Sequence, residues 1–312
     1  MTIIEKTRID RILLQKVAAL EYQVGNTPLY QIIRLYNKPG VLIFAKQEWK
    51  QIGGSVKARA AYNIIRVAIE KGELTPDKTL LDATSGNTGI AYASIAKELG
   101  IKLSLCVPEN ASAERKQILQ SLGAKIIYTS KFEGTDGAQI LAKSLAEQEP
   151  EKYFYADQYK NNDNWKAHYH TTAFEIYNKQ PGITHFVAGL GTTGTFTGTG
   201  RKLKELNPKI QLTSLQPDVA LHGLEGWKHM ETAAVPAIYD PSLADENLEV
   251  GTEEAYEIIK QAYEKEGLLL SPSSAANLAG AFKIADKINN GTIVTILPDN
   301  ADKYNEIIQR II

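Results

Sequence analysis

The sequence predicts an α/β protein in which twisted, mostly parallel sheets are flanked by helices. Strand-like and helix-like segments alternate along most of the 312 residues, which is typical of parallel sheets covered on both faces. Glycine ends several of the helical segments, and polar, glycine-rich turns follow two of the strand-like ones. The chain is long enough for one large or two medium-sized domains.

The first half of the chain contains four pairs of strand-like and helix-like segments. Gly72, Gly100 and Gly123 follow three of the helical patterns and are expected to end them. The acidic, proline-containing stretch 147–151 is a candidate crossing between domains. Strands are expected at 41–45, 79–83, 101–107 and 125–128, and helices at 55–71, 87–99, 112–122 and 135–148.

The second half repeats this alternation, beginning with a strand at 185–188 and a helix that runs to Leu206. The least regular segment, 216–250, is too long for a simple loop, and we expect it to be functional or to pack over a site. Further strands are expected at 211–215, 268–270 and 292–297, and further helices at 252–266 and 275–288.

The composition argues against several classes of function. Apolar residues make up 43% of the chain and charged residues 23%, as in ordinary globular proteins. The net charge of −1, without a basic block, argues against nucleic acid as a partner. No secretory signal or membrane-spanning run is recognisable, so we expect a soluble cytoplasmic protein. The single cysteine, Cys106, is expected to be a small buried hydrophobe in a strand.

Lys57 is the candidate catalytic residue. It follows the flexible turn Gly53-Gly54-Ser55, just inside the start of the helix expected at 55–71. Burial and a helix N-terminus both disfavour positive charge, so they would lower the pKa of this lysine and prepare it as a nucleophile. By itself, the pattern also fits an ordinary solvated helix lysine. Arg59 is expected to be a structural ion-pair partner.

The turn Thr84-Ser85-Gly86-Asn87-Thr88-Gly89 is a candidate carboxylate site. It joins a strand to a helix, so backbone N–H groups and the helix dipole converge there. Ser85, Asn87 and Thr88 add side-chain donors. The alternative interpretation is a plain helix cap formed by Asn87 or Ser85.

The turn Gly189-Leu190-Gly191-Thr192-Thr193-Gly194-Thr195 matches the dinucleotide-binding pattern, but such a match alone is weak. It lies deep in the second half of the chain, and the nearest suitable acid, Asp218, comes later than that fold requires. The threonine hydroxyls suit a single phosphate instead. A lysine nucleophile, a carboxylate-sized turn and a phosphate-sized turn together predict a pyridoxal-phosphate (PLP) enzyme acting on an amino acid.

Ser273, at a strand-to-helix junction, is a further candidate. A serine beside the pyridine nitrogen would not force its protonation, which suits elimination and replacement at the β-carbon better than transamination. The alternative is a capping serine. No metal site is expected, because no evident carboxylate or cysteine partner accompanies the histidines at 168, 170, 185, 222 and 229.

These motifs together resemble the cysteine synthase / cystathionine β-synthase family, which are fold-type II PLP enzymes with a tryptophan synthase β-like fold. The resemblance is greatest to the B-type cysteine synthases, and it runs from Gly25-Asn26-Thr27-Pro28-Leu29 to Asp302-Lys303-Tyr304. It implies a homodimer that forms L-cysteine from an O-activated L-serine and a sulfur nucleophile, through an α-aminoacrylate intermediate. The acceptor, O-acetylserine or O-phosphoserine, stays open, as does the donor, which could be sulfide, thiosulfate or a thiocarboxylated carrier protein.

The resemblance also implies roles for individual residues. Lys57 resembles the lysine that binds the cofactor covalently, Asn87 the residue that bonds its 3-hydroxyl, and Ser273 the partner of its pyridine nitrogen. The implied phosphate site comprises Gly191, Thr192, Thr193, Gly194 and Thr195, and the implied substrate-carboxylate site Thr84, Ser85, Gly86, Asn87, Thr88 and Gln158. The stretch 222–228 resembles an active-site rim loop, in which Gly223 and Lys228 are expected to contact substrate.

The implied domain division is a smaller substrate domain at 41–151 and a larger domain formed by 1–40 and 152–312. The chain departs from the common family pattern at Gln51-Ile52, Ala58, Thr193 and Ala275, and none of these changes removes a chemical role. Cystathionine β-synthase-like or serine/threonine dehydratase activity is the nearest alternative. A nucleotide-binding dehydrogenase would leave Lys57 without a role, and a non-catalytic paralogue is the third possibility.

Overall fold

The computed structural model describes residues 10–84 and 86–312, which form two sheets flanked by helices. The strands of the smaller sheet lie in the order β5 (Lys125–Thr129), β4 (Lys102–Pro108), β3 (Thr79–Ala83) and β6 (Tyr153–Tyr155). Those of the larger sheet lie in the order β1 (Leu29–Ile32), β2 (Val41–Gln47), β10 (Gly291–Leu297), β7 (His185–Gly189), β8 (Gln211–Pro217) and β9 (Glu246–Val250). Every neighbouring pair is parallel except β1 and β2, which confirms the predicted fold class.

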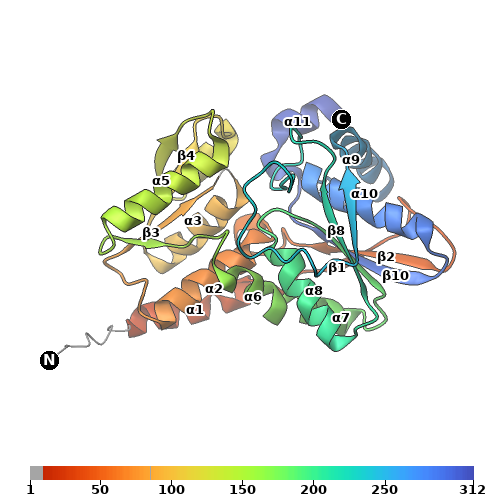
Figure 1. The fold of residues 1–312 in the computed structure, drawn as a ribbon, viewed down its shortest axis with the longest axis horizontal. Coiled ribbons are helices and arrows are strands. Elements are labelled where there is room, and N and C mark those ends of the chain that lie inside the picture. Colours follow the sequence, from red (N-terminus) through yellow and green to blue (C-terminus); the bar gives the residue numbers. More distant parts are fainter. Residues whose placement is uncertain (1–9, 85) are drawn as a thin grey trace.

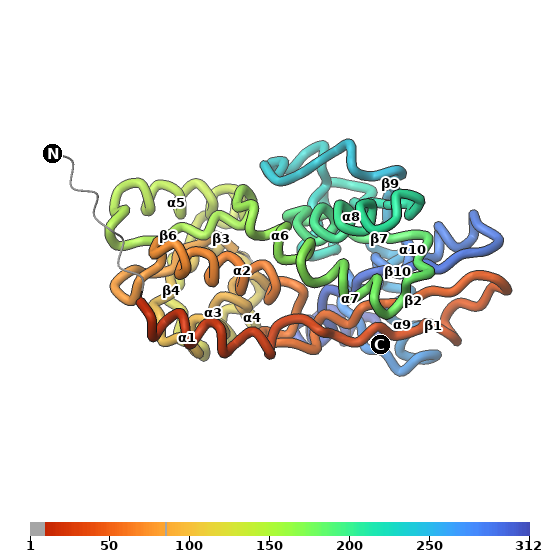
Figure 2. The backbone as a smooth tube through the Cα atoms, turned by 90° about the horizontal axis from the view of Figure 1, so that it is seen from below, coloured from red at the N-terminus to blue at the C-terminus, as the bar shows by residue number. Residues whose placement is uncertain are grey.

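Helices cover both sheets, and the two sheets form separate halves in Figure 1. The smaller half carries α1 (Arg11–Ala19), α2 (Lys57–Glu70), α3 (Asn87–Leu99), α4 (Ala113–Ser121) and α5 (Gly134–Gln148). The larger half carries α7 (Thr172–Lys179), α8 (Gly194–Leu206), α9 (Thr252–Glu266), α10 (Pro272–Lys287) and α11 (Asn305–Ile311). Between them, α6 (Asn162–His170) packs against α2 on one side and α8 on the other, as Figure 2 shows. Short 3-10 turns occur at Glu21–Gln23, Ile52–Gly54 and Ala301–Lys303.

Glycine ends the helices where the sequence predicts it. Gly100 follows α3 with φ 72°, and Gly267 follows α9 with φ 69°. Both positions lie in the left-handed region, which a residue without a Cβ atom adopts without strain. The helix boundaries at these positions therefore follow from the local sequence.

The central strands are buried on both faces. In β10, Ile293 packs into the core under α9 and α10, whereas the next residue, Val294, packs into the core on the opposite face with Phe186 and Phe196. Continuous apolar runs of this kind are expected in parallel sheets covered by helices. Cys106 is fully buried in β4, and this burial raises the pKa of its thiol to about 12, which confirms the expected structural role.

Several elements differ from the prediction. The strand expected at 268–270 is wrong, because Leu270 makes only an isolated bridge to Asn300. The sequence analysis missed β1, β6 and β9, which have between three and five residues and give little periodic signal. It also missed the helices α1, α7 and α11, and α6, whose sequence is mostly polar.

Two strands belong to other sheets than the predicted domain division suggests. The division placed residues 41–151 together, but β2 pairs with β10 in the larger sheet. The short strand β6 pairs with β3 in the smaller sheet, although it follows residue 151. The division of the chain into domains stays a prediction, and sheet membership places the crossings after β2 and after β6. No helix among the described residues is both long and apolar enough to cross a membrane.

Candidate active site

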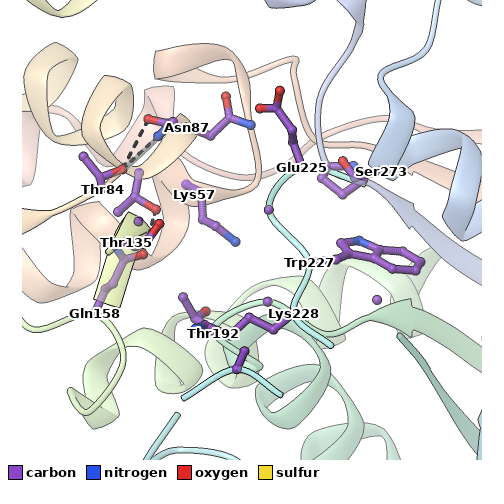
Figure 3. A pocket seen from close by; sticks show the side chains of 18 of the residues that line it. Lys57, Thr84, Asn87, Thr135, Gln158, Thr192, Glu225, Trp227, Lys228 and Ser273 are labelled. Atoms are coloured by element: carbon purple, nitrogen blue, oxygen red, sulfur yellow. Dashed lines mark hydrogen bonds between the residues drawn. The ribbon is translucent and has the colours of Figure 1, made fainter. Parts of the chain in front are cut away.

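A cavity of about 560 Å³ lies where residues from both sheets meet. Thr84 follows β3, Gly189 ends β7 and Pro298 follows β10, so the carboxyl ends of parallel strands line its wall. This edge is where open α/β sheets bind ligands. Figure 3 shows Lys57 in the middle of the cavity, between Thr84 and Gln158 on one side and Ser273 and Trp227 on the other.

Lys57 is the first residue of α2, as the sequence predicts. The turn before it contains Gly53 with φ 71° and Gly54 with φ 61°, conformations that favour glycine. Burial lowers the pKa of the Lys57 amine, and the nearby Asp299 carboxylate partly offsets this effect. The site therefore favours a neutral amine more than water does.

The turn at Thr84 is built differently from the predicted cap. The Thr84 hydroxyl accepts the backbone N–H groups of Gly86 at 3.1 Å and Gly89 at 3.2 Å. Gly86 occupies the N-cap position of α3 and Asn87 is the first helical residue, so Asn87 is not the cap. Thr88 Oγ1 donates to Gln158 Oε1 at 2.7 Å, and Gln158 Nε2 donates to a main-chain oxygen of β3 at 2.9 Å. Thr84, Gly86, Asn87, Thr88 and Gln158 all line the cavity, whereas Ser85 lies outside the described residues.

The second turn, at the start of α8, also lines the cavity, through Gly191, Thr192, Thr193 and Thr195. Gly194 is buried at the first position of α8 and is not among the lining residues. A Cβ atom on Gly191 would lie 2.0 Å from the main-chain oxygen of Gly226, so only glycine fits there. Within the described part of the chain, the buried hydroxyl of Thr193 has no hydrogen-bond partner. Such a hydroxyl is available to a bound anion.

Two side chains of α6 contact this second turn. Asn164 Nδ2 donates to Thr192 Oγ1 at 3.1 Å, and His168 Nε2 lies 3.3 Å from Thr195 Oγ1. His168 is buried, and this burial lowers the pKa of its imidazole to about 3, so the ring is neutral. The sequence analysis considered His168 only as a metal ligand and missed this contact.

Ser273 lines the cavity, and it is not the cap of α10. Ser271 occupies the capping position, where its hydroxyl accepts the Ser274 N–H at 3.2 Å. The Ser273 hydroxyl lies 3.3 Å from that of Ser271 and is therefore held near the cavity wall. The alternative interpretation of Ser273 as a helix cap is wrong.

The irregular segment between β8 and β9 packs over the cavity, as predicted. We call residues 221–229 the rim loop. Lys228 lines the cavity, with its Nζ 3.5 Å from Asp136 Oδ1 and 5.1 Å from the ring centre of Tyr159. Gly223 is not among the lining residues, and its N–H donates to Thr252 Oγ1 at 2.9 Å.

Sequence reasoning missed two charged residues around the cavity. Arg115 is buried, lies 4.7 Å from the ring centre of Tyr304 and forms an ion pair with Glu225. Asp299 is fully buried and accepts hydrogen bonds from Asn87 and Tyr304. Asp299 lies two residues after a predicted strand, so the logic that identified Thr84 could have found it. Arg115 lies on a helix and carries no such signal.

Taken together, these features define an active site with one partly exposed lysine and two turns suited to anions. The chain belongs to the family of pyridoxal-phosphate dependent enzymes, whose model matches residues 20–299. It is 43% identical to the cysteine synthase of Aquifex aeolicus (strain VF5), over 90% of this chain and 88% of that protein. It is 40% identical to the O-acetylserine dependent cystathionine beta-synthase of Bacillus subtilis (strain 168), over 90% of this chain and 94% of that protein.

A solved structure supports the same class. The crystal structure of a hydrogen sulfide-producing enzyme from Fusobacterium nucleatum matches with a TM-score of 0.86 at 33% identity, covering 92% of this chain and 98% of that one. The cofactor is pyridoxal phosphate, as in the family as a whole. The residues present fit this group, because Lys57 and the unpartnered Thr193 hydroxyl belong to one cavity. This favours a phosphate-binding role for the second turn over dinucleotide binding.

Proposed function

We propose that this chain catalyses β-replacement on an O-activated L-serine with a sulfur nucleophile, forming L-cysteine. One observation carries the proposal: Lys57 shares a cavity with a turn suited to a carboxylate, a turn suited to a phosphate, and the uncharged Ser273. The similarity to proteins named cysteine synthase supports the same conclusion.

Lys57 would hold the cofactor and act as the general base. When bound, pyridoxal phosphate supplies an electron sink for charge that develops at the substrate α-carbon. Lys57 Nζ takes the α-proton and later returns a proton to the same carbon. Because burial lowers the pKa of Lys57, more of the amine is in the neutral form that this step requires.

The remaining residues would position the two anionic groups. The loop Gly191–Thr195 would hold the cofactor phosphate, with the Thr193 hydroxyl as a donor. The N-terminus of α3, with Thr88 and Gln158, would hold the substrate carboxylate and so orient the α-proton toward Lys57. Ser273 would leave the pyridine nitrogen unprotonated, which favours chemistry at the β-carbon over transamination.

O-Acetylserine is the acceptor that the charges around the cavity favour. Lys228 is paired with Asp136, and Arg115 with Glu225, so the positive charge of each is already compensated. A phosphate leaving group would have to compete with those carboxylates, whereas an acetyl ester would not. We expect kcat/KM for O-acetylserine to exceed that for O-phosphoserine when sulfide is the nucleophile, and the reverse ratio would refute this choice.

The decisive experiment measures cysteine formation by the parent protein, by Lys57→Ala and by Lys71→Ala. Lys71 is exposed at the other end of the same helix and is the matched control. We expect Lys57→Ala to lose about 10²- to 10⁴-fold in turnover and Lys71→Ala to retain the parent rate. Parent-like turnover by a folded Lys57→Ala protein would refute the proposal.

A cystathionine β-synthase-like activity is the second candidate, because the Bacillus subtilis relative at 40% identity carries that name. The two activities share the acceptor half of the reaction and differ in the nucleophile. Assays with sulfide, thiosulfate, a thiocarboxylated carrier protein and homocysteine, each with O-acetylserine, separate them. Faster turnover with homocysteine than with the three sulfur donors would select the second candidate. Pyruvate release from L-serine would instead indicate a dehydratase.

A further inference from the structure

The side-chain amide of Asn87 is held at both ends. Its Nδ2 donates to Asp299 Oδ2 at 2.7 Å, and its Oδ1 accepts from Lys303 Nζ at 2.9 Å. Asp299 is fully buried and Lys303 is 9% exposed, so water competes little for either contact. Both partners follow β10 of the larger sheet, whereas Asn87 begins α3 beside the smaller sheet.

These two partners permit only one orientation of the amide. A carboxylate can only accept hydrogen bonds, and an ammonium group can only donate them. Rotating the Asn87 amide by half a turn would place its N–H groups against Lys303 and its oxygen against Asp299. Two favourable contacts would become two unfavourable ones in a buried environment. The observed orientation leaves one Nδ2–H of Asn87 for a ligand in the cavity that this residue lines.

The two partners are themselves fixed. The Tyr304 hydroxyl donates to the same Asp299 oxygen at 2.8 Å. Lys303 Nζ also donates to the main-chain oxygen of Gly54 at 2.9 Å, in the turn that precedes α2. The segment after β10 therefore connects Asn87 and the start of α2 to the larger sheet. Lys303 and Tyr304 belong to the C-terminal motif that the sequence analysis noted without assigning a role.

We propose that Asp299 and Lys303 are positioning residues that fix the Asn87 amide for hydrogen bonding to the bound cofactor. The proposal rests on the proposed function, in which Asn87 contacts the cofactor. Asp299 and Lys303 act through Asn87, and each makes a different contact of the flipped amide unfavourable. Lys303 holds the oxygen of the amide, and Asp299 holds its nitrogen.

The test compares four variants with the parent protein by the dissociation constant of PLP from the apoprotein and by the visible absorption maximum after reconstitution. Lys303→Met removes the donor, and Lys303→Arg restores one. Asp299→Asn replaces an acceptor by a group that also donates, so the flipped amide loses one of its two unfavourable contacts. Asp302→Asn makes the same change at an exposed position three residues away and is the control.

We expect Lys303→Met and Asp299→Asn each to weaken PLP binding about tenfold and to shift the absorption maximum, as expected for loss of one oriented hydrogen bond. Lys303→Arg and Asp302→Asn should bind PLP within about twofold of the parent. In an Asn87→Ala background, the further loss from either harmful change should fall below about twofold, because positioning residues act only through their target. If Lys303→Met does not fold, Asp299→Asn, which keeps size and shape, carries the test.

Three results would each overturn the proposal. The first is full additivity between Asn87→Ala and either harmful variant. The second is parent-like PLP binding by both harmful variants, and the third is parent-like PLP binding by Asn87→Ala itself. If turnover nevertheless depends on Lys57, the proposed function stands and only the positioning role falls. If turnover does not depend on Lys57, the proposed function is refuted, whatever these binding measurements show.

Discussion

Arg115 and Glu225 form an ion pair across the cavity, between α4 on the smaller sheet and the rim loop on the larger one. Lys228 and Asp136 form a second pair between the same loop and α5. In one pair the rim loop supplies the acid, and in the other it supplies the base. Two ion pairs thus connect the rim loop to the smaller half of the molecule.

Glu225→Gln should loosen the rim loop without unfolding the protein. Glu225 is 39% exposed whereas Arg115 is buried, but glutamine keeps an oxygen that can accept from the guanidinium, so we expect a loss of about 1 kcal/mol in the free energy of unfolding. We expect faster amide hydrogen exchange in residues 221–229 and a nearly unchanged melting temperature. Glu231→Gln, at an exposed position just beyond the loop, is the control. Equal exchange in the two variants would show that the Arg115 contact does not restrain the loop.

Gly191→Ala should weaken cofactor binding through a steric clash. The added methyl group would lie 2.0 Å from the main-chain oxygen of Gly226, so either the turn Gly191–Thr195 or the rim loop must move. Overpacking of this kind costs about 1–3 kcal/mol, which corresponds to roughly tenfold or more in the PLP dissociation constant. The control is Gly182→Ala, where an added Cβ meets no atom within 4 Å. Equal PLP affinity in both variants would contradict a phosphate-binding role for this loop.

Asp82→Asn should stabilise the protein at high pH more than at low pH. Asp82 is fully buried in β3, and this burial raises the pKa of its carboxyl to about 7 from the ordinary 3.8. Folding therefore favours the protonated acid, and the stability from this group is full below pH 4 and is lost as the pH rises toward 7. At about 1.4 kcal/mol per pKa unit, the loss above pH 7 is about 4 kcal/mol.

Urea unfolding at pH 5 and at pH 8 tests this expectation. The stability advantage of Asp82→Asn over the parent should grow from pH 5 to pH 8. Asp77→Asn, an exposed position shortly before β3, should show no such growth. A difference between Asp82→Asn and the parent that does not vary with pH would mean that Asp82 is not protonated in the folded state near pH 5.

Arg59→Met should destabilise the fold strongly. Arg59 is 1% exposed and donates hydrogen bonds to both Glu48 and Glu175, as its predicted structural role requires. Removing one member of a buried ionic group leaves its partners unpaired and costs about 3–5 kcal/mol. Arg66→Met, on the same helix, breaks an exposed pair with Glu70 and a hydrogen bond to Asn63 Oδ1, and should cost about 1 kcal/mol or less. Similar unfolding free energies for the two variants would contradict this account.

The sequence predicted those parts of the fold and site that depend on local pattern. The helix α3 begins and ends at the expected residues, and its end is set by Gly100, which terminates it. Lys57 and the two glycine-rich turns line one cavity because parallel strands bring their carboxyl ends to one edge. These features follow from neighbouring residues and from a general rule of sheet topology.

Features that depend on distant packing were not predictable in this way. The partners of Asn87 lie more than 200 positions away, at Asp299 and Lys303, and only the assembled sheets bring them together. The resemblance of 222–228 to a rim loop implied the same role for Gly223 and Lys228, but the Gly223 N–H donates to Thr252 and Gly223 does not line the cavity. Short strands such as β6 gain their stability from pairing and not from their own three residues.

The pairing of β2 with β10 bears on how the protein folds as it is synthesised. Val41 pairs with Gly291, so the ribosome must add about 250 further residues before β2 gains this neighbour. The strands of the smaller sheet lie between Thr79 and Tyr155, and that sheet can form much earlier. A nascent chain that stops before β10 therefore leaves an apolar strand without a central partner and exposed to aggregation. Because Lys57 follows that strand after the connection 48–56, the cofactor site is completed only when nearly all of the chain has been made.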